Sequence, residues 1–315
     1  MQNNSLSELI KNTINEDAAI LQKIELPNIK KRVRIYLKRE DLLHPIISGN
    51  KWRKLKYNLL KANEEGHKTL LTFGGAYSNH IHATAGAGSI FGFNTIGIIR
   101  GEQTLPLNST LTEAKKYGMR IEYVDRKSYR NKTQPKFTES LKEKFGDFYL
   151  IPEGGTNQLA VKGCTEIIDN INIDYDFIFS ACGTGGTLSG LICALNGNKK
   201  IYGIPVLKGA GFLQQEIEEH VLKFSRTKYN NWELKLDFHF GGYAKINKEL
   251  VNFIYEFEEL NKIQVEPIYT AKMLFGIKAM IENDEIPEDS TIIALHTGGL
   301  QGRAGMKEKI IKYLS

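Results

Sequence analysis

Residues 47–54 read Ile-Ser-Gly-Asn-Lys-Trp-Arg-Lys and place one lysine, Lys51, between a turn and a helical pattern. Ser-Gly-Asn at 48–50 strongly favours a turn, and Leu55 and Leu59 follow with the spacing of a helix. A cation near a helix N-terminus is electrostatically unfavourable. Most lysines are solvated surface residues. This one therefore indicates a function only if another part of the chain supplies chemistry that needs a lysine.

On both sides of this stretch, apolar strand candidates alternate with helical patterns along the chain. The strands are expected at 33–37, 69–73, 95–99, 120–124, 148–152, 177–180, 201–206 and 291–295. Such alternation predicts parallel sheets covered by helices on both faces. We therefore expect an α/β protein with two open, mostly parallel twisted sheets. A larger domain would comprise residues 1–50 and 155–315, with a smaller α/β domain, 51–154, inserted into it. Residues 5–23 are expected to form an amphipathic helix.

Composition and charge favour a globular protein that works on small molecules. The 315 residues are 41% hydrophobic and 25% charged, as in ordinary globular proteins. No apolar run is long enough to span a bilayer, and the N-terminus lacks an export signal, so we expect a cytoplasmic protein without a membrane partner. Residues 30–39 are basic, but no nucleic-acid-reading element accompanies them, so no nucleic-acid partner is expected.

A glycine-rich loop, Cys-Gly-Thr-Gly-Gly-Thr at 182–187, lies between a strand and a helix. Glycines let backbone N–H groups face an anion, and the helix N-terminus adds a favourable dipole. The loop lacks the Gly-Lys-Ser/Thr of a Walker motif. A dinucleotide fingerprint would need glycine at Leu188 and an acid about 20 residues on, yet no Asp or Glu occurs between Asp176 and Glu216. The loop predicts a small phosphate ester, the alternative being a turn that only packs helix against strand.

A second loop, Gly-Gly-Ala-Tyr-Ser-Asn-His at 74–80, follows another strand. Sites in open α/β sheets gather at the carboxyl ends of strands, and this loop is suited to a substrate carboxylate. A plain helix cap is the ordinary alternative for its serine. His80 and His82 lie two residues apart, a poor metal spacing on a helix, and the three cysteines show no paired metal spacing and no disulfide framework. No metal is expected.

Taken together, residues 48–54, 74–80, 183–187 and 296–299 resemble the 1-aminocyclopropane-1-carboxylate deaminase / D-cysteine desulfhydrase family. These are pyridoxal-phosphate enzymes of the tryptophan-synthase-β fold type, and the resemblance extends over about residues 37–299. It implies the same fold, pyridoxal 5'-phosphate as cofactor, a small amino-acid substrate and a homodimer.

The resemblance also implies residue roles. Lys51 would bind the cofactor aldehyde covalently, Asn79 would lie near the cofactor's phenolic oxygen, and Ser78, Asn79 and His80 would contact substrate. Tyr243 and Tyr269 would be active-site tyrosines, although most of the chain's 14 tyrosines must be ordinary core or rim residues. The other implied cofactor contacts are Gly183, Thr184, Gly185, Gly186, Thr187, Thr270, Thr297 and Gly298.

Two positions bear on the substrate. In the deaminases a glutamate follows the second tyrosine and keeps the cofactor ring nitrogen protonated, whereas Thr270 stands there in this chain. A hydroxyl cannot hold that proton as a carboxylate does. His80 also replaces a glutamine that the deaminases tend to carry. Both features favour β-elimination from D-cysteine, giving pyruvate, ammonia and sulfide, with Lys51 or Tyr269 as the base.

Three alternatives stay open: deamination of aminocyclopropane carboxylate, dehydration of D-serine or elimination from β-chloroalanine, and a non-catalytic cofactor-binding protein. The presence of Lys51 argues against the last. Two further departures favour neither activity: Ala271 replaces a usual glycine before Lys272, and the surroundings of Tyr243, Gly-Gly-Tyr-Ala-Lys, fit neither member of the family closely.

Overall fold

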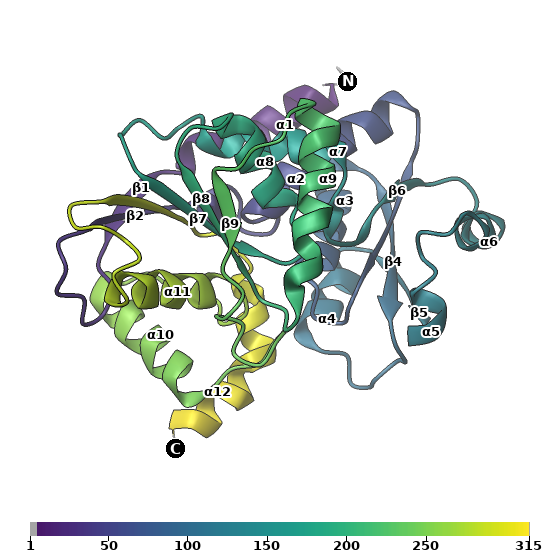
Figure 1. Cartoon of the computed structure of the whole chain (residues 1–315). Coiled ribbons are helices and arrows are strands. Elements are labelled where there is room, and N and C mark those ends of the chain that lie inside the picture. The colour runs from purple at the N-terminus through teal and green to yellow at the C-terminus, as the bar shows by residue number, and fades with distance from the viewer. Residues whose placement is uncertain (1–4, 315) are drawn as a thin grey trace.

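The computed structural model describes residues 5–314 and contains two sheets that lie apart, the larger at the left of Figure 1 and the smaller at the right. The six-stranded sheet has the order β1-β2-β10-β7-β8-β9, and the four-stranded sheet the order β5-β4-β3-β6. Only the β1–β2 pair is antiparallel among the strand pairs of this described part. The expected pair of mostly parallel sheets is confirmed.

The elements agree closely with the expected alternation. The strands are β1 (Leu21–Ile24), β2 (Arg34–Lys38), β3 (Thr69–Gly74), β4 (Asn94–Arg100), β5 (Arg120–Val124), β6 (Tyr149–Ile151), β7 (Phe177–Cys182), β8 (Lys200–Pro205), β9 (Trp232–Leu234) and β10 (Thr291–Leu295). The α-helices are α1 (Leu6–Thr13), α2 (Asn50–Glu64), α3 (Asn79–Phe91), α4 (Ser109–Lys116), α5 (Arg126–Tyr129), α6 (Pro135–Phe145), α7 (Gln158–Thr165), α8 (Gly186–Leu195), α9 (Leu213–Ser225), α10 (Lys248–Asn261), α11 (Thr270–Glu282) and α12 (Lys307–Leu314). Among these helices, none combines the length and the apolar character that a membrane span requires.

One expected element is wrong. The amphipathic helix predicted for residues 5–23 ends at Thr13, and residues 21–24 form the edge strand β1. Strand β1 pairs antiparallel with β2, with Leu21 opposite Lys38 and Ile24 opposite Ile35. Pairing with a sheet edge thus overrides the helical spacing of Ile14 and Leu21, because long-range pairing outweighs local propensity. The short strand β9 was also not anticipated.

Helices cover both faces of the larger sheet. On one face, α10 and α11 bury Phe257, Leu274 and Ile277 against the sheet, while on the other α7, α8 and α9 contribute Leu191 and Ile217. This double coverage is what an apolar parallel sheet requires.

Helix α2 leads from the larger sheet toward the smaller one and packs closely on α7. At their crossing, a Cβ on Gly163 would lie 1.9 Å from the carbonyl oxygen of Arg53, so only glycine fits. All strands of the smaller sheet fall between residues 69 and 151. We propose, on this basis, that the inserted domain has the boundaries 51 and 154 expected from the sequence.

Candidate active site

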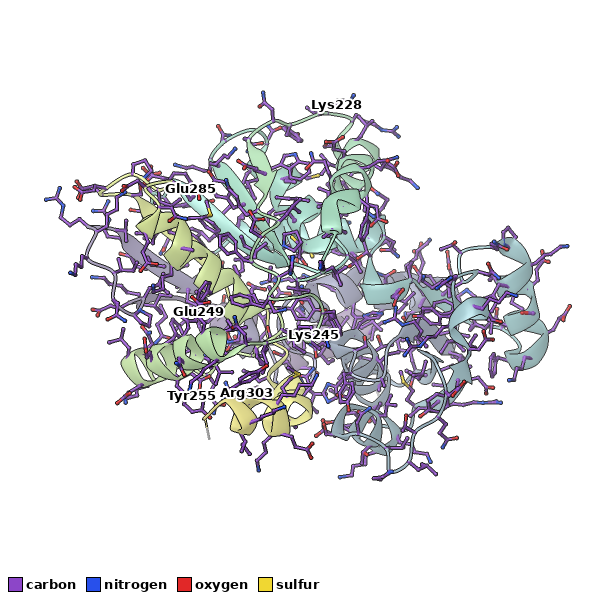
Figure 2. All side chains as sticks on the ribbon, turned by 60° about the horizontal axis from the view of Figure 1, so that its bottom comes forward. Lys228, Lys245, Glu249, Tyr255, Glu285 and Arg303 are labelled. Carbon is purple, nitrogen blue, oxygen red and sulfur yellow. The ribbon has the colours of Figure 1, made fainter. Side chains whose placement is uncertain are left out.

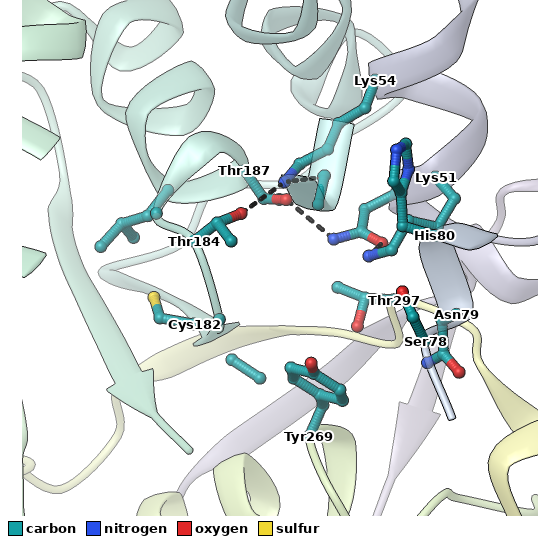
Figure 3. Close-up of a pocket in the computed structure, with 16 residues that line it drawn as sticks. Lys51, Lys54, Ser78, Asn79, His80, Cys182, Thr184, Thr187, Tyr269 and Thr297 are labelled. Atoms are coloured by element: carbon teal, nitrogen blue, oxygen red, sulfur yellow. Dashed lines mark hydrogen bonds between the residues drawn. The ribbon is translucent and has the colours of Figure 1, made fainter. Parts of the chain in front are cut away.

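A pocket between the carboxyl ends of β3 and β7 brings together most of the residues singled out in the sequence (Figure 3). Lys51, Ser78, Asn79 and His80 line one side of it. The other lining residues among those predicted are Gly183, Thr184, Gly185, Thr187, Tyr269 and Thr297. Gly186, Thr270 and Gly298 are chain neighbours of lining residues, and Tyr243 does not line the pocket but contacts Tyr269 edge to face, with ring centroids 6.1 Å apart.

Lys51 occupies the second position of α2, directly after a turn that only glycine can make. Gly49 has a φ of 65°, and a Cβ there would lie 2.0 Å from the Thr297 carbonyl oxygen. The Lys51 amine donates a hydrogen bond of 2.9 Å to Asn50 Oδ1, and Asn50 Nδ2 donates one of 2.8 Å to Thr187 Oγ1. Burial, and then the nearby charge of Lys54, lower the pKa of Lys51 to about 7. A large share of this amine is therefore unprotonated near neutral pH and able to act as a nucleophile.

A second buried lysine, Lys54, lies one helical turn further along α2 and was not identified from the sequence. Its Nζ donates hydrogen bonds to the Gly154 carbonyl (3.1 Å), Thr156 Oγ1 (3.1 Å) and Thr184 Oγ1 (3.3 Å) (Figure 3). Burial lowers its pKa, and within residues 5–314 no carboxylate pairs with it. A buried cation held only by neutral oxygens is costly. Such a group is well suited to an anionic ligand.

The glycine loop next to Lys54 has the shape of an anion cradle. Gly185 has a φ of 71°, and a Cβ on it would lie 2.6 Å from Ile217 Cγ1, while a Cβ on Gly186 would lie 2.9 Å from the Thr156 side chain. Side chains are thus excluded from both positions. Helix α8 begins here, and the first N–H groups of a helix have no partner within it. Those groups and the Lys54 ammonium together can hold a phosphate.

Ser78 and His80 have structural roles as well as places in the pocket. Ser78 caps α3, its Oγ accepting a hydrogen bond from the Ile81 N–H (3.3 Å). His80 is buried and its Nε2 lies 2.8 Å from Thr72 Oγ1, while its Nδ1 has no partner among the described residues. Burial, together with the charges of Lys51 and Lys54, holds the pKa of His80 well below its usual value. His80 is therefore neutral, and because the Thr72 hydroxyl donates to the Ile151 carbonyl and accepts from Nε2, the Nδ1 atom is left as an acceptor.

Asn79 is oriented by the C-terminal part of the chain. Its Oδ1 accepts a hydrogen bond of 3.0 Å from Gln301 Nε2. A Cβ on Gly299 would lie only 2.3 Å from Asn79 Nδ2 and would clash with it. Glycine at 299 therefore makes room for the amide that the pocket presents.

Tyr269 and Thr270 stand at the start of α11, where a buried carboxylate fixes the backbone. Glu266 accepts hydrogen bonds from the N–H groups of Ile268 (2.7 Å), Tyr269 (2.9 Å) and Thr270. Burial raises the pKa of Glu266 to about 7, against the lowering effect of these bonds. Sequence reasoning missed Glu266, which carries no N-cap signal because the N-cap position of α11 is Tyr269.

The two hydroxyls of this segment differ in their surroundings. Burial raises the pKa of Tyr269 well above its usual value, and contact with Tyr243 adds to the effect. The Tyr269 phenol is therefore protonated across the physiological range. The Thr270 hydroxyl is completely buried near the Glu266 carboxylate but makes no aligned hydrogen bond within residues 5–314. Thr270 itself does not line the pocket but directly follows Tyr269, which does. In the same part of the chain, no three His, Cys, Asp or Glu side chains gather as metal ligands.

Comparison with known proteins gives consistent results. A family model described as "Pyridoxal-phosphate dependent enzyme" matches residues 19–298. The chain is 31% identical, over 92% of each chain, to a Pyrococcus furiosus protein named for a proposed 1-aminocyclopropane-1-carboxylate deaminase activity. It is 28% identical to the Arabidopsis thaliana bifunctional D-cysteine desulfhydrase/1-aminocyclopropane-1-carboxylate deaminase, over 88% of this chain and 75% of that one. A crystal structure of an ACC deaminase homologue superposes with a TM-score of 0.82 at 27% identity, covering 99% of this chain and 100% of the other.

Proposed function

Because this chain belongs to the pyridoxal-phosphate-dependent enzyme family, within the group of 1-aminocyclopropane-1-carboxylate deaminases and D-cysteine desulfhydrases, we propose that it catalyses β-elimination from D-cysteine. One water molecule is consumed, and the products are pyruvate, ammonia and sulfide. The observation that carries the choice of reaction is Thr270, whose buried hydroxyl lacks an aligned partner and stands where the deaminases have a carboxylate. The preference for the D-isomer rests on the family resemblance.

The pocket fits this cofactor. A small phosphate ester matches the glycine cradle of residues 183–187 and the unpaired Lys54, and an aldehyde matches a lysine with a pKa of about 7. When bound, pyridoxal phosphate supplies an electron sink for the bonds at the Cα of the amino acid. The Thr270 hydroxyl would serve the ring nitrogen without keeping it protonated, which suffices when the leaving group is a thiolate.

The proton transfers follow from the surroundings of the two candidate bases. Lys51 Nζ, with its pKa near neutrality, accepts the Cα proton. The Tyr269 phenol has a pKa raised well above its usual value, so it keeps its proton and acts as a donor at Oη. Ser78 and the N-terminus of α3 bind the substrate carboxylate. This arrangement favours Lys51 over Tyr269 as the base.

Deamination of aminocyclopropane carboxylate is the second candidate, because the relatives in Pyrococcus and Arabidopsis carry that activity in their names. We expect D-cysteine to release sulfide and pyruvate at least tenfold faster, by kcat/KM, than aminocyclopropane carboxylate releases 2-oxobutanoate. Thr270→Glu should shift this ratio toward ring opening, because a carboxylate holds the ring-nitrogen proton. The assay measures both substrates on both proteins, and faster ring opening by the unaltered protein would contradict the proposal.

We expect Ser78→Ala to slow turnover by about 10- to 100-fold, in line with the loss of one hydrogen bond to a charged group, here the substrate carboxylate. The visible absorbance of the bound cofactor should be unchanged. Loss of the helix cap should also lower the free energy of unfolding by about 1 kcal/mol. Asn108→Ala, which removes the cap of α4 outside the pocket, is the matched control for that loss. Equal kinetics in Ser78→Ala and the control would remove Ser78 from the site.

The homodimer and the cytoplasmic location expected from the sequence stay predictions. Light scattering of the purified protein tests the first, since a dimer has twice the chain mass of 35.6 kDa.

A further inference from the structure

The loop that carries Tyr243 has an unusual backbone. Phe240, Gly241, Gly242 and Ala244 all have positive φ values, 53°, 91°, 119° and 53°. Left-handed conformations cost roughly 1 kcal/mol or more for residues with a side chain, and Phe240 and Ala244 both bear that cost. A loop with this conformation needs support from outside.

Lys272 supplies that support from α11. Its Nζ donates hydrogen bonds of 2.8 Å each to the carbonyl oxygens of His239, just before the strained turn, and of Gly242, within it. The side chain is completely buried, and within residues 5–314 no carboxylate forms an ion pair with it. Burial lowers the pKa of Lys272 to about 8, partly opposed by Glu266. An apolar residue at position 272 would avoid the free-energy cost of burying an amine. We therefore attribute the role of Lys272 to its two hydrogen bonds with backbone carbonyls.

The same helix carries the partner of Tyr243. Tyr269 stands at the first turn of α11, three residues before Lys272, and its ring contacts that of Tyr243 edge to face. From the solvent side, Lys309 donates a weaker hydrogen bond of 3.3 Å to the Ala244 carbonyl. Figure 2 labels Lys245, the last residue of the loop, and Glu249 in the first turn of α10, which follows it in the chain. Lys272 thus connects the helix that positions Tyr269 with the loop that presents Tyr243.

We propose that Lys272 is a positioning residue that clamps the loop 239–245 and so holds Tyr243 against Tyr269 at the edge of the active site. The contact between Lys272 and the loop does not depend on the proposed reaction. The expected effect of Lys272 on turnover does rest on the proposed function. Among ionisable groups, Glu266 acts on the Lys272 ammonium, whereas Lys208 and Lys309 contact the loop itself, at Gly242 and at the Ala244 carbonyl.

Hydrogen exchange measured by mass spectrometry tests the clamp without any substrate. Three amides of the loop are bonded within it: Gly241 to His239 Nδ1 (2.8 Å), Gly242 to the His239 carbonyl (3.0 Å) and Lys245 to the Gly242 carbonyl (3.1 Å). In Lys272→Met these amides should exchange at least tenfold faster, while peptides of the two sheets keep their rates. The matched control is Lys278→Met, on the same helix but in an exposed ion pair with Glu282.

Turnover adds a second readout. Lys272→Met should lower kcat more than it changes KM, and combining it with Tyr243→Phe should cost little more than the larger single effect, because both act through one phenol. If Lys272→Met fails to fold, Lys272→Gln, which can still reach one carbonyl, gives the same comparison. Unchanged exchange in the loop, or additive effects with Tyr243→Phe, would overturn the clamp. Absence of sulfide production with faster loop exchange would instead contradict only the proposed function.

Discussion

Replacing Lys51 by alanine is expected to abolish covalent attachment of the cofactor and to reduce turnover by at least about 10³-fold, as when a covalent catalyst is removed. The amine is both the group that binds the cofactor aldehyde and the base that we propose takes the Cα proton. The phosphate cradle and Lys54 stay in place in this variant, so pyridoxal phosphate should still bind reversibly. Absorbance spectra before and after dialysis check the first part, and a sulfide assay the second.

The low pKa of Lys51 gives this prediction a pH dependence. Capture of the aldehyde requires the neutral amine, which at pH 7 would be roughly one part in 3,000 for an ordinary lysine but is about half for Lys51. The rate at which cofactor-free protein takes up pyridoxal phosphate should therefore rise with pH through about 7 and then level off. Lys54→Met should move this midpoint upward, because it removes the positive charge that helps lower the pKa of Lys51. A rate that keeps rising through pH 9 would show that Lys51 has an ordinary pKa.

Lys54→Met carries the second large expectation, and its two effects have opposite signs. Loss of a charge-assisted hydrogen bond to phosphate should weaken cofactor binding by about 10- to 100-fold. In the cofactor-free protein the same change removes a buried cation without a carboxylate partner, so the free energy of unfolding should rise or stay the same. Cofactor titration and thermal unfolding with and without pyridoxal phosphate measure both effects.

A matched control for Lys54→Met is Lys56→Met, two residues along the same helix. Lys56 pairs with Glu16 and Glu166 outside the pocket, so its loss should destabilise the protein without changing the cofactor dissociation constant. Equal cofactor affinity in Lys54→Met and the unaltered protein would show that the phosphate does not lie at Lys54.

The sequence predicts the fold well because its strands and loops carry strong local signals. Strands β5 and β10 occupy the expected residues, and the other expected strands differ by one or two residues at their ends. The glycines at 49, 183, 185 and 186 also reveal the turns of the pocket, since their positions admit little else. By contrast, the prediction of one helix over residues 5–23 is wrong. The spacing of apolar residues there is also compatible with a short helix followed by an edge strand, and the pairing with β2 determines that residues 21–24 form a strand.

The residues that sequence reasoning missed act through contacts between distant segments. Lys54 looks like any lysine on a basic helix until Thr156 and Thr184, more than 100 residues away, enclose it. Glu266 is not the N-cap residue of α11, and its burial depends on the surrounding fold, so the sequence carries no local signal for it. Tyr243 was identified by resemblance alone, and its place beside Tyr269 depends on a loop whose support, Lys272, has no local signature.

The most direct test of the account is to locate the covalent attachment of the cofactor. The pocket contains two buried lysines, Lys51 and Lys54, one helical turn apart, and only the first is proposed to bond to the aldehyde. Purified protein loaded with pyridoxal phosphate is treated with borohydride, digested and mapped by mass spectrometry. The account predicts that the reduced cofactor is found on the peptide bearing Lys51 and that fragmentation places it on that residue. An adduct on Lys54 or on any other lysine, with Lys51 unmodified, would contradict it.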